Sequence, residues 1–286
     1  MKKIIFASLF AVMFASFTFA QTAPIEKSVA VFGAKIRYLE AGDASKPTVI
    51  LLHGLGANAE SWQFNIVPLS QSFHVIAPDQ VGFGKSDKPF LKYRAGTFVD
   101  FLDKFMAELK IEKASLVGNS MGGWVTGLFA IKYPNKVEKI VLVDAAGLTP
   151  KVVNYDQIYQ LNTSTRDEVR ANLKLIFANQ AYSNNEALID QFMTQRVLAG
   201  DGYTINSLID SIKRKEDFLD TKLSEIKKPT LIIWGKQDGL LPFSDGEKFN
   251  KGIAGSNLII FDQCGHVPQV EKAKEFNEAV LKFLQN

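Results

Sequence analysis

The chain has 286 residues, of which 47% are hydrophobic and 22% are charged, with a formal net charge of +3. This length and apolar content suffice for one large domain with a substantial core. The balanced charge shows no basic patch of the kind that nucleic-acid-binding proteins carry. The single cysteine, Cys264, excludes an internal disulfide, and we expect it to be a small apolar core residue rather than a nucleophile.

Residues 1–20 have the three parts of a secretory signal peptide. A pair of lysines precedes the largely apolar run 4–14, and the small residue Ala20 stands directly before Gln21. An uncleaved anchor is the alternative, but the apolar region is shorter than the ~20 residues that span a bilayer comfortably. We therefore expect cleavage near Ala20 and a secreted or periplasmic mature protein with no stable membrane span. Removal of the two lysines lowers the net charge to +1.

The mature chain alternates apolar runs with amphipathic segments. A hairpin is expected over residues 28–41. Further strands are expected at 48–52, 73–77, 114–117, 139–144, 230–234 and 257–261, and helices at 62–69, 96–109, 124–130 and 270–284. The continuous apolar character of the strands suits a sheet that is covered on both faces. This alternation predicts an α/β fold, a mostly parallel twisted sheet with helices on both faces.

Residues 149–222 interrupt the alternation. They contain no strand pattern, and two segments begin like helices with a capping box, Thr165 to Glu168 and Ser183 to Glu186. Thr97 and Asp100 suggest a similar start for the helix at 96–109. We therefore expect a core built from residues 21–148 and 223–286, with a helical cap inserted at 149–222.

A short Gly-x-Ser-x-Gly segment, Gly118 to Gly122, lies between an expected strand and an expected helix. A serine at the apex of such a turn has a strained backbone, and side chains at the flanking glycine positions would clash. A glycine-rich turn that merely opens a helix is the alternative. The strand before the segment and the helix after it favour a nucleophile elbow, with Ser120 as the nucleophile.

A serine nucleophile needs a base, and the base needs an acid that orients it. His266 and Asp238 each follow an expected strand, at the sheet edge where loops gather into a site. The other two histidines suit other roles, His74 a structural one within a strand and His53 a place in a glycine-rich loop. Asp144 also ends a strand and is the rival for the acid. Asp79, which opens another glycine-rich loop, is expected to order that loop through its backbone amides.

The negative charge of a tetrahedral intermediate needs preorganised N–H donors. One donor is expected from the amide of Met121, at the N-terminus of a helix whose dipole favours an anion. The other is expected from the amide of Leu55, in the segment His53-Gly54-Leu55-Gly56 that follows the strand at 48–52.

These segments, in this order, resemble the α/β-hydrolase superfamily over nearly the whole mature length. The segment with Asn119 before Ser120 and the Cys-Gly-His segment around His266 are similar to the meta-cleavage-product C–C hydrolases. That resemblance implies a substrate-binding role for Asn119 and a cap arginine that holds a carboxylate. Arg196 is only a weak match to that arginine, and a solvated arginine on a helix surface is the favoured interpretation. Two features depart from those hydrolases. Val267 stands where those hydrolases usually have tryptophan. They are also generally cytoplasmic, whereas this chain is expected to be exported.

The sequence therefore predicts a serine hydrolase that cleaves carboxylic esters of apolar substrates through an acyl-enzyme, without a metal or organic cofactor. The nearer alternative is C–C hydrolysis of a vinylogous keto acid by the same three residues. The more distant alternative is a non-catalytic binding protein on the same fold. Ser120 argues against haloalkane dehalogenases and epoxide hydrolases of this fold, which use aspartate at the elbow.

Overall fold

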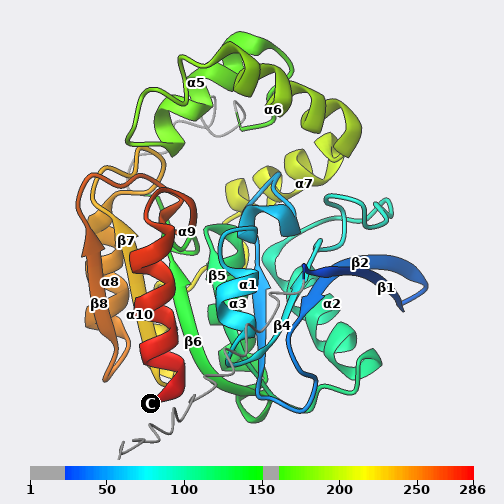
Figure 1. The fold of residues 1–286 in the computed structure, drawn as a ribbon, viewed down its shortest axis with the longest axis vertical. Helices are drawn as coiled ribbons and strands as arrows, with labels where there is room; N and C mark the ends of the chain where they lie inside the picture. Colours follow the sequence, from blue (N-terminus) through cyan, green and yellow to red (C-terminus); the bar gives the residue numbers. More distant parts are fainter. Residues whose placement is uncertain (1–22, 151–160) are drawn as a thin grey trace, which may run out of the picture.

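The structure is a computed structural model that describes residues 23–150 and 161–286. Within these ranges, eight strands form one twisted sheet in the order β1-β2-β4-β3-β5-β6-β7-β8 (Figure 1). The strands are β1 (Ile25–Val31), β2 (Ala34–Ala41), β3 (Thr48–Leu52), β4 (His74–Pro78), β5 (Ala114–Asn119), β6 (Val137–Val143), β7 (Thr230–Gly235) and β8 (Asn257–Phe261). The first hairpin pairs antiparallel, and all pairs from β4 to β8 are parallel. The expected α/β architecture is therefore confirmed.

Helices connect these strands. In the described ranges they are η1 (Ala59–Trp62), α1 (Ile66–Ser70), α2 (Ala95–Glu108), α3 (Met121–Lys132), η2 (Pro134–Lys136), α5 (Arg166–Ile176), α6 (Glu186–Ala199), α7 (Gly202–Lys213), η3 (Leu223–Glu225), α8 (Phe243–Gly252), α9 (Pro268–Glu271) and α10 (Ala273–Gln285). The helix expected at 270–284 is in fact two, because the backbone of Lys272 is not helical. The helix expected at 62–69 is likewise divided into η1 and α1.

Helix starts agree with the sequence only in part. The capping box of Thr165 and Glu168 opens α5 as expected. The box expected at Ser183 is wrong, because α6 is capped by Asn185, whose side chain accepts from the Leu188 amide (3.1 Å). The Ser183 hydroxyl instead donates to the Gln180 carbonyl (3.0 Å).

The helix expected at 96–109 is present as α2, but the capping pair expected at Thr97 and Asp100 is wrong. Arg94 is its N-cap, so the helix begins at Ala95, two residues before Thr97. The Thr97 hydroxyl lies within the first turn and accepts from the Arg94 amide (3.3 Å).

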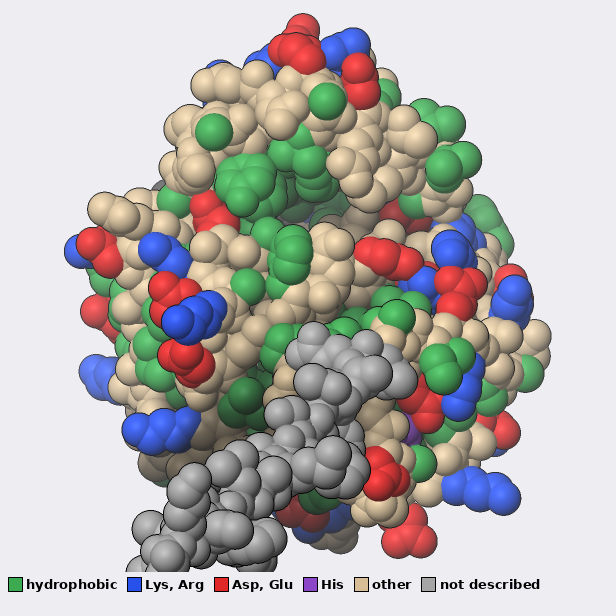
Figure 2. All heavy atoms as spheres, viewed as in Figure 1, with side chains coloured by type: hydrophobic (Ala, Val, Ile, Leu, Met, Phe, Trp, Pro, Cys, Tyr) green, Lys and Arg blue, Asp and Glu red, His purple; other side chains and the backbone are tan. Residues whose placement is uncertain are grey.

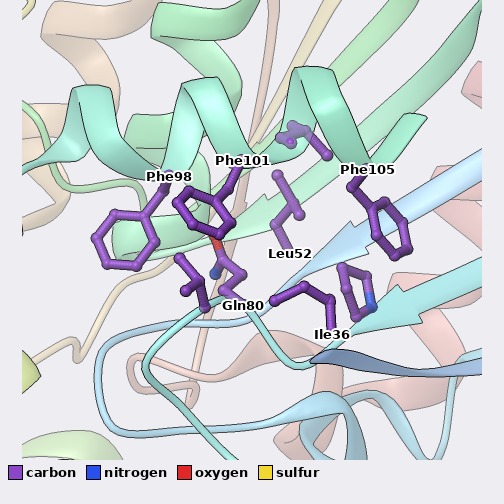
Figure 3. A pocket seen from close by; sticks show the side chains of 9 residues that line it. Ile36, Leu52, Gln80, Phe98, Phe101 and Phe105 are labelled. Atoms are coloured by element: carbon purple, nitrogen blue, oxygen red, sulfur yellow. The ribbon is translucent and has the colours of Figure 1, made fainter. Parts of the chain in front are cut away.

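Two apolar layers cover the sheet, and successive residues of a strand feed opposite layers. Ile50 and Leu52 of β3 pack with α2, α3 and α8, whereas Val49 and Leu51 pack with α1 and α10. This arrangement requires strands that are apolar on both faces, which explains the continuous apolar runs in the sequence. On the α2 side, a cavity of about 20 Å³ lies among Phe98, Phe101, Phe105 and six neighbours (Figure 3). None of the side chains expected to carry chemistry lines this cavity.

Helices α5, α6 and α7 lie between β6 and β7 in the sequence and above one end of the sheet (Figure 1). Helix α7 joins the main core through Ile205, Leu208 and Ile209. Helices α5 and α6 have a separate buried cluster that includes Leu173 and Ile189. Val197, near the end of α6, is 74% exposed. The inserted segment is therefore anchored to the core by α7, while α5 and α6 pack mainly on each other.

The loop after β4 is ordered by a buried ion pair. Asp79 is fully buried, and its carboxylate accepts from the backbone amides of Ala59 and Lys85 (both 2.8 Å). The buried Arg37 guanidinium lies 3.3 Å from the same carboxylate. The expected loop-ordering role of Asp79 is thus confirmed, and Arg37 is a partner that the sequence did not indicate.

The expected signal peptide lies outside the described residues. Within residues 23–150 and 161–286, every helix falls short of the length or the apolar character that a membrane span requires.

Candidate active site

Ser120 lies at the sharp turn between β5 and α3. Its backbone is left-handed, with φ of 55° and ψ of −118°. The Ser120 amide donates to the Val143 carbonyl (2.9 Å), and the Ser120 carbonyl accepts from the amides of Trp124 and Ala146. These bonds hold a conformation that is costly for a residue with a side chain.

The glycines beside Ser120 are required by close packing. A Cβ on Gly118 would collide with the Gly122 carbonyl, and a Cβ on Gly122 would collide with the Leu52 carbonyl. The spacing of the motif is therefore a steric requirement of the turn, as the sequence analysis argued.

His266 and Asp238 are brought together from the loops after β8 and β7. The Nδ1–H of His266 donates to Asp238 Oδ2 (2.7 Å). Asp238 Oδ1 accepts from the amides of Leu240 (2.8 Å) and Leu241 (3.0 Å). Both side chains are nearly inaccessible to solvent. Because Nδ1 carries the donated proton, Nε2 is the ring nitrogen left to accept a proton from a nucleophile.

Asn119 ties the elbow to the histidine loop. Its Nδ2 donates to the His266 carbonyl (3.0 Å) and to the Val143 carbonyl (3.2 Å). The residue is only 5% exposed. These bonds direct the Nδ2 group into the protein and fix the position of His266 relative to Ser120. The substrate-binding role that the resemblance implies for Asn119 stays a prediction.

The two expected oxyanion donors flank the nucleophile. Met121 begins α3 directly after Ser120, and its amide lies at the positive end of the helix dipole. Leu55 follows Gly54, on which a Cβ would lie 3.2 Å from the Ser120 Cβ. The loop after β3 thus packs directly against the nucleophile.

The buried side chain of His53 holds the loop after β3 in place through two hydrogen bonds. Its Nδ1–H donates to the Gly54 carbonyl (2.8 Å), and its Nε2 accepts from the Gln80 amide (3.0 Å). Complete burial lowers the pKa of His53, which favours the neutral ring that these two bonds require. His74, by contrast, lies at the start of β4 and contacts Glu40 (2.7 Å), as expected for a structural histidine.

Asp144, the rival acid, is also part of the site. It directly follows β6 and is fully buried, and its Oδ1 accepts from the Gly235 amide (2.9 Å). Burial and the neighbouring Asp238 carboxylate raise the pKa of Asp144 well above its ordinary value. Asp238, rather than Asp144, makes the hydrogen bond to His266.

Arg196 is not the solvated surface residue that the sequence favoured, so that expectation is wrong. Its side chain is 13% exposed and forms a close ion pair with the buried Asp201. Its Nη2 donates to Asn162 Oδ1 (2.8 Å), and its Nε has no acceptor among the described residues. A Cβ on Gly56 would lie 3.6 Å from Arg196 Nη1. The guanidinium therefore lies against the loop that carries Leu55.

Two other kinds of chemistry, a cysteine nucleophile and a metal ion, have little support from Cys264 and from the acidic side chains of the site. Cys264 is buried, and burial raises its thiol pKa, so it suits the expected role as a core residue. Asp144, Asp238 and His266 have a spacing that a metal ion could use. However, the 2.7 Å hydrogen bond between His266 and Asp238 already uses two of those atoms.

Sequence reasoning missed the contacts that join the inserted helices to the site. The His266 amide donates to the Ile176 carbonyl (2.7 Å) at the end of α5, and the Gly239 amide donates to the Leu175 carbonyl (3.0 Å). Glu271 accepts from the Gly265 amide (2.6 Å) and from the amide of Ala178 (3.3 Å). Backbone contacts of this kind leave no pattern in a single sequence.

The apolar surroundings of the site come from both parts of the chain. Val267, directly after the candidate base, packs against the α5–α6 cluster together with Phe192 and Met193. Figure 2 shows hydrophobic side chains gathered between the inserted helices and the end of the sheet. An apolar portion of a substrate would pack against these side chains.

We predict that Asn119→Ala slows the reaction of Ser120 with a fluorophosphonate about tenfold or more. The substitution removes the side-chain donor to the His266 carbonyl, whereas the Val143 carbonyl keeps the Ser120 amide, so that His266 is held less firmly at a cost of about 1–3 kcal/mol. The rate of covalent labelling measures the effect without knowledge of the substrate. Asn184→Ala, at an exposed position, is the control. A labelling rate for Asn119→Ala equal to that of the unmodified protein would contradict the assigned role.

Comparisons with known proteins agree with this geometry. Residues 47–273 match the family described as alpha/beta hydrolase fold. A 2-hydroxy-6-oxononadienedioate/2-hydroxy-6-oxononatrienedioate hydrolase from Escherichia coli K12 is 36% identical over 265 residues, which cover 87% of this chain and 91% of that protein.

Two solved structures are similar to the chain. A meta-cleavage product hydrolase from Pseudomonas fluorescens IP01 has a TM-score of 0.83 and 30% identity, covering 91% of this chain and 97% of that one. The crystal structure of a bacterial membrane phospholipase A has a TM-score of 0.81 and 29% identity, covering 92% of this chain and 86% of that one. From the match to the family, the shared fold and the identity to these relatives, we conclude that the chain is a hydrolase that belongs to the α/β-hydrolase family.

Proposed function

We propose that the protein hydrolyses a carbon–carbon bond in a vinylogous keto acid of the 2-hydroxy-6-oxo-dienoate class. The observation that carries the proposal is the largely buried guanidinium of Arg196 beside Gly56, because a carboxylate-bearing substrate needs a cation in the site to bind its carboxylate. The names of several relatives, among them the Escherichia coli hydrolase, support the same class. The comparisons thus favour the C–C alternative over the ester interpretation that the sequence analysis put first.

In the proposed reaction, Ser120 Oγ attacks the keto carbonyl while His266 Nε2 takes its proton. Asp238 holds the imidazole through Nδ1 and stabilises the imidazolium that forms. The amides of Leu55 and Met121 stabilise the oxyanion. Before this attack the dienol takes its keto form, so that the bond to be broken joins the attacked carbonyl to a saturated carbon. Collapse of the intermediate breaks this C–C bond, and the leaving carbanion, delocalised as a dienolate, takes the proton from His266, which leaves an acyl-enzyme. Neutral His266 then takes a proton from water, which attacks the acyl group and releases the acid and Ser120.

The difference from ester hydrolysis lies in the leaving group. An ester expels an alkoxide, whereas the keto acid must expel a carbanion. That carbanion becomes acceptable when its electron pair is delocalised along a conjugated chain that ends in a carbonyl and a carboxylate. Arg196 is the candidate to hold that carboxylate. Its Nε–H lacks an acceptor among the described residues, and its Nη groups are fixed by Asp201 and Asn162.

Ester hydrolysis remains the second candidate, and one specific observation favours it. Val267 directly follows His266 and packs into the apolar α5–α6 cluster, at the position where the C–C hydrolases that the sequence resembles usually have tryptophan. An apolar acyl chain would suit these surroundings. The same three residues would carry out this reaction too.

We predict that the mature protein bleaches the colour of a chromogenic ring-fission dienolate, and that Ser120→Ala abolishes this turnover. Hydrolysis of p-nitrophenyl esters from acetate to palmitate, measured in parallel, separates the two candidates. A higher kcat/KM for the keto acid than for every ester supports the proposal. Ester turnover without bleaching would replace it with the ester function. Failure of a fluorophosphonate to label Ser120 would favour the non-catalytic alternative.

We further predict that Arg196 affects the two substrate classes differently. Arg196→Gln/Asp201→Asn removes both charges together, so that no buried carboxylate is left unpaired. A lost charge-assisted contact of about 1.5–3 kcal/mol corresponds to a KM for the keto acid that is roughly 10- to 150-fold higher. The KM for a neutral ester should change less than threefold. Asp201→Asn alone, which keeps the guanidinium, is the matched control, and equal changes for both substrates would count against a carboxylate-holding role.

We also propose that the protein is exported, because of the signal-like pattern in residues 1–20. N-terminal sequencing of the protein recovered from a bacterial periplasm or culture medium should begin at or near Gln21. An intact Met1 in a cytoplasmic fraction would refute export.

A further inference from the structure

Asp144 lies beside Asp238 and His266. The roles proposed for Ser120, His266 and Asp238 leave this buried acid without a function. It follows β6, and Asp238 follows the neighbouring parallel strand β7, so both carboxylates emerge at the same sheet edge. One carboxylate oxygen of each aspartate and one ring nitrogen of His266 lie within 4.8 Å of one another. Asp144 is therefore a close neighbour of both the candidate acid and the candidate base.

The backbone of Asp144 is held in an unusual conformation. Its φ is 41°, in the left-handed region, and its amide donates to the Ile233 carbonyl (2.9 Å). Asparagine and aspartate tolerate this region better than most other residues. The position thus admits a short polar side chain, but nothing in the backbone requires that side chain to be an acid.

The two oxygens of Asp144 have different surroundings. Oδ1 accepts from the Gly235 amide, whereas the buried Oδ2 has no hydrogen-bond partner among the described residues. A buried carboxylate oxygen without a donor is unfavourable, and protonation relieves it. The neighbouring Asp238 carboxylate is the acceptor for such a proton, so the arrangement indicates that Asp144 is protonated and donates toward Asp238.

The negative charge of the pair belongs on Asp238. That carboxylate accepts from the amides of Leu240 and Leu241 and from His266, whereas Asp144 accepts from one amide. Two neighbouring buried carboxyl groups cannot both ionise cheaply. The raised pKa of Asp144, which burial and Asp238 cause, agrees with this assignment. His266, Cys264 and Glu271 are the other titratable groups near Asp144.

We propose that Asp144 is a second positioning acid for His266, neutral while Asp238 is ionised and able to ionise and orient the imidazole when the Asp238 charge is removed. The proposal rests on the proposed Ser120–His266–Asp238 machinery. It does not depend on whether the substrate is a keto acid or an ester.

The test compares Asp238→Asn, Asp144→Asn and the double variant in the full mature chain. Asparagine preserves the shape at both positions and tolerates the φ of residue 144, and thermal unfolding of each variant checks the fold. The readout is the rate of fluorophosphonate labelling of Ser120 from pH 5 to pH 9. Asp238→Asn should label about a hundredfold more slowly than the unmodified protein, rather than show the ~10⁴-fold loss seen when an orienting acid has no substitute.

The pH profile distinguishes this role from a merely structural one. Burial, the main cause of the raised pKa of Asp144, persists in Asp238→Asn, but the neighbouring charge that raises this pKa further is gone, so Asp144 should ionise at a lower pH than in the unmodified protein. The labelling rate of Asp238→Asn should then rise with pH as Asp144 ionises, and the double variant should lack this rise. The double variant should also label about a further hundredfold more slowly. Asp144→Asn alone should slow labelling by less than tenfold.

One result would contradict the role of Asp144, and a different result would contradict the proposed function. Equal labelling of Asp238→Asn and the double variant at every pH, with both folded, would overturn the role of Asp144. Absence of labelling in the unmodified protein would instead overturn the proposed function. The downfield proton resonance of the His266 Nδ1–H gives a second measurement, because it should persist in Asp238→Asn at high pH and be absent from the double variant.

Discussion

The site depends on the left-handed backbone of Ser120 and on the close packing that holds it there. The turn from β5 into α3 has room for a side chain at residue 120 but not at residues 118 or 122, which meet the backbone of neighbouring segments. The same turn presents the Met121 amide at a helix N-terminus and aligns the Asn119 amide with the histidine loop. One conformational constraint therefore places the nucleophile, one oxyanion donor and the support of the base.

Features that depend on local sequence pattern could be predicted. The apolar runs indicated the parallel strands because each strand is covered on both faces, and the loops after β5, β7 and β8 carry the residues singled out from their position after a strand. The start of α6 could not be fixed, because Ser183 and Asn185 are both good caps and the difference lies in the turn before them.

Features that depend on contacts between distant segments could not be predicted. Arg196 looked like a solvated arginine on a helix surface because the sequence does not show which side chain pairs with it, and only the fold shows its partner Asp201. Asn119 suggested a ligand contact from its place beside the nucleophile, yet its amide is used by two carbonyls, one of them 147 residues away. Asp144 was recognised as an acid at a strand end, but its relation to Asp238 required the sheet order.

The inserted helices are joined to the site by main-chain groups. The carbonyls of Leu175 and Ile176 accept from the amides of Gly239 and His266, in the two loops that carry the acid and the base. Such bonds do not depend on which side chains α5 and α6 display. The surface that faces a substrate is therefore free to diverge, or to be redesigned residue by residue, without loss of alignment between the helices and the reacting groups. A scaffold of this kind separates the evolution of selectivity from the maintenance of reactivity.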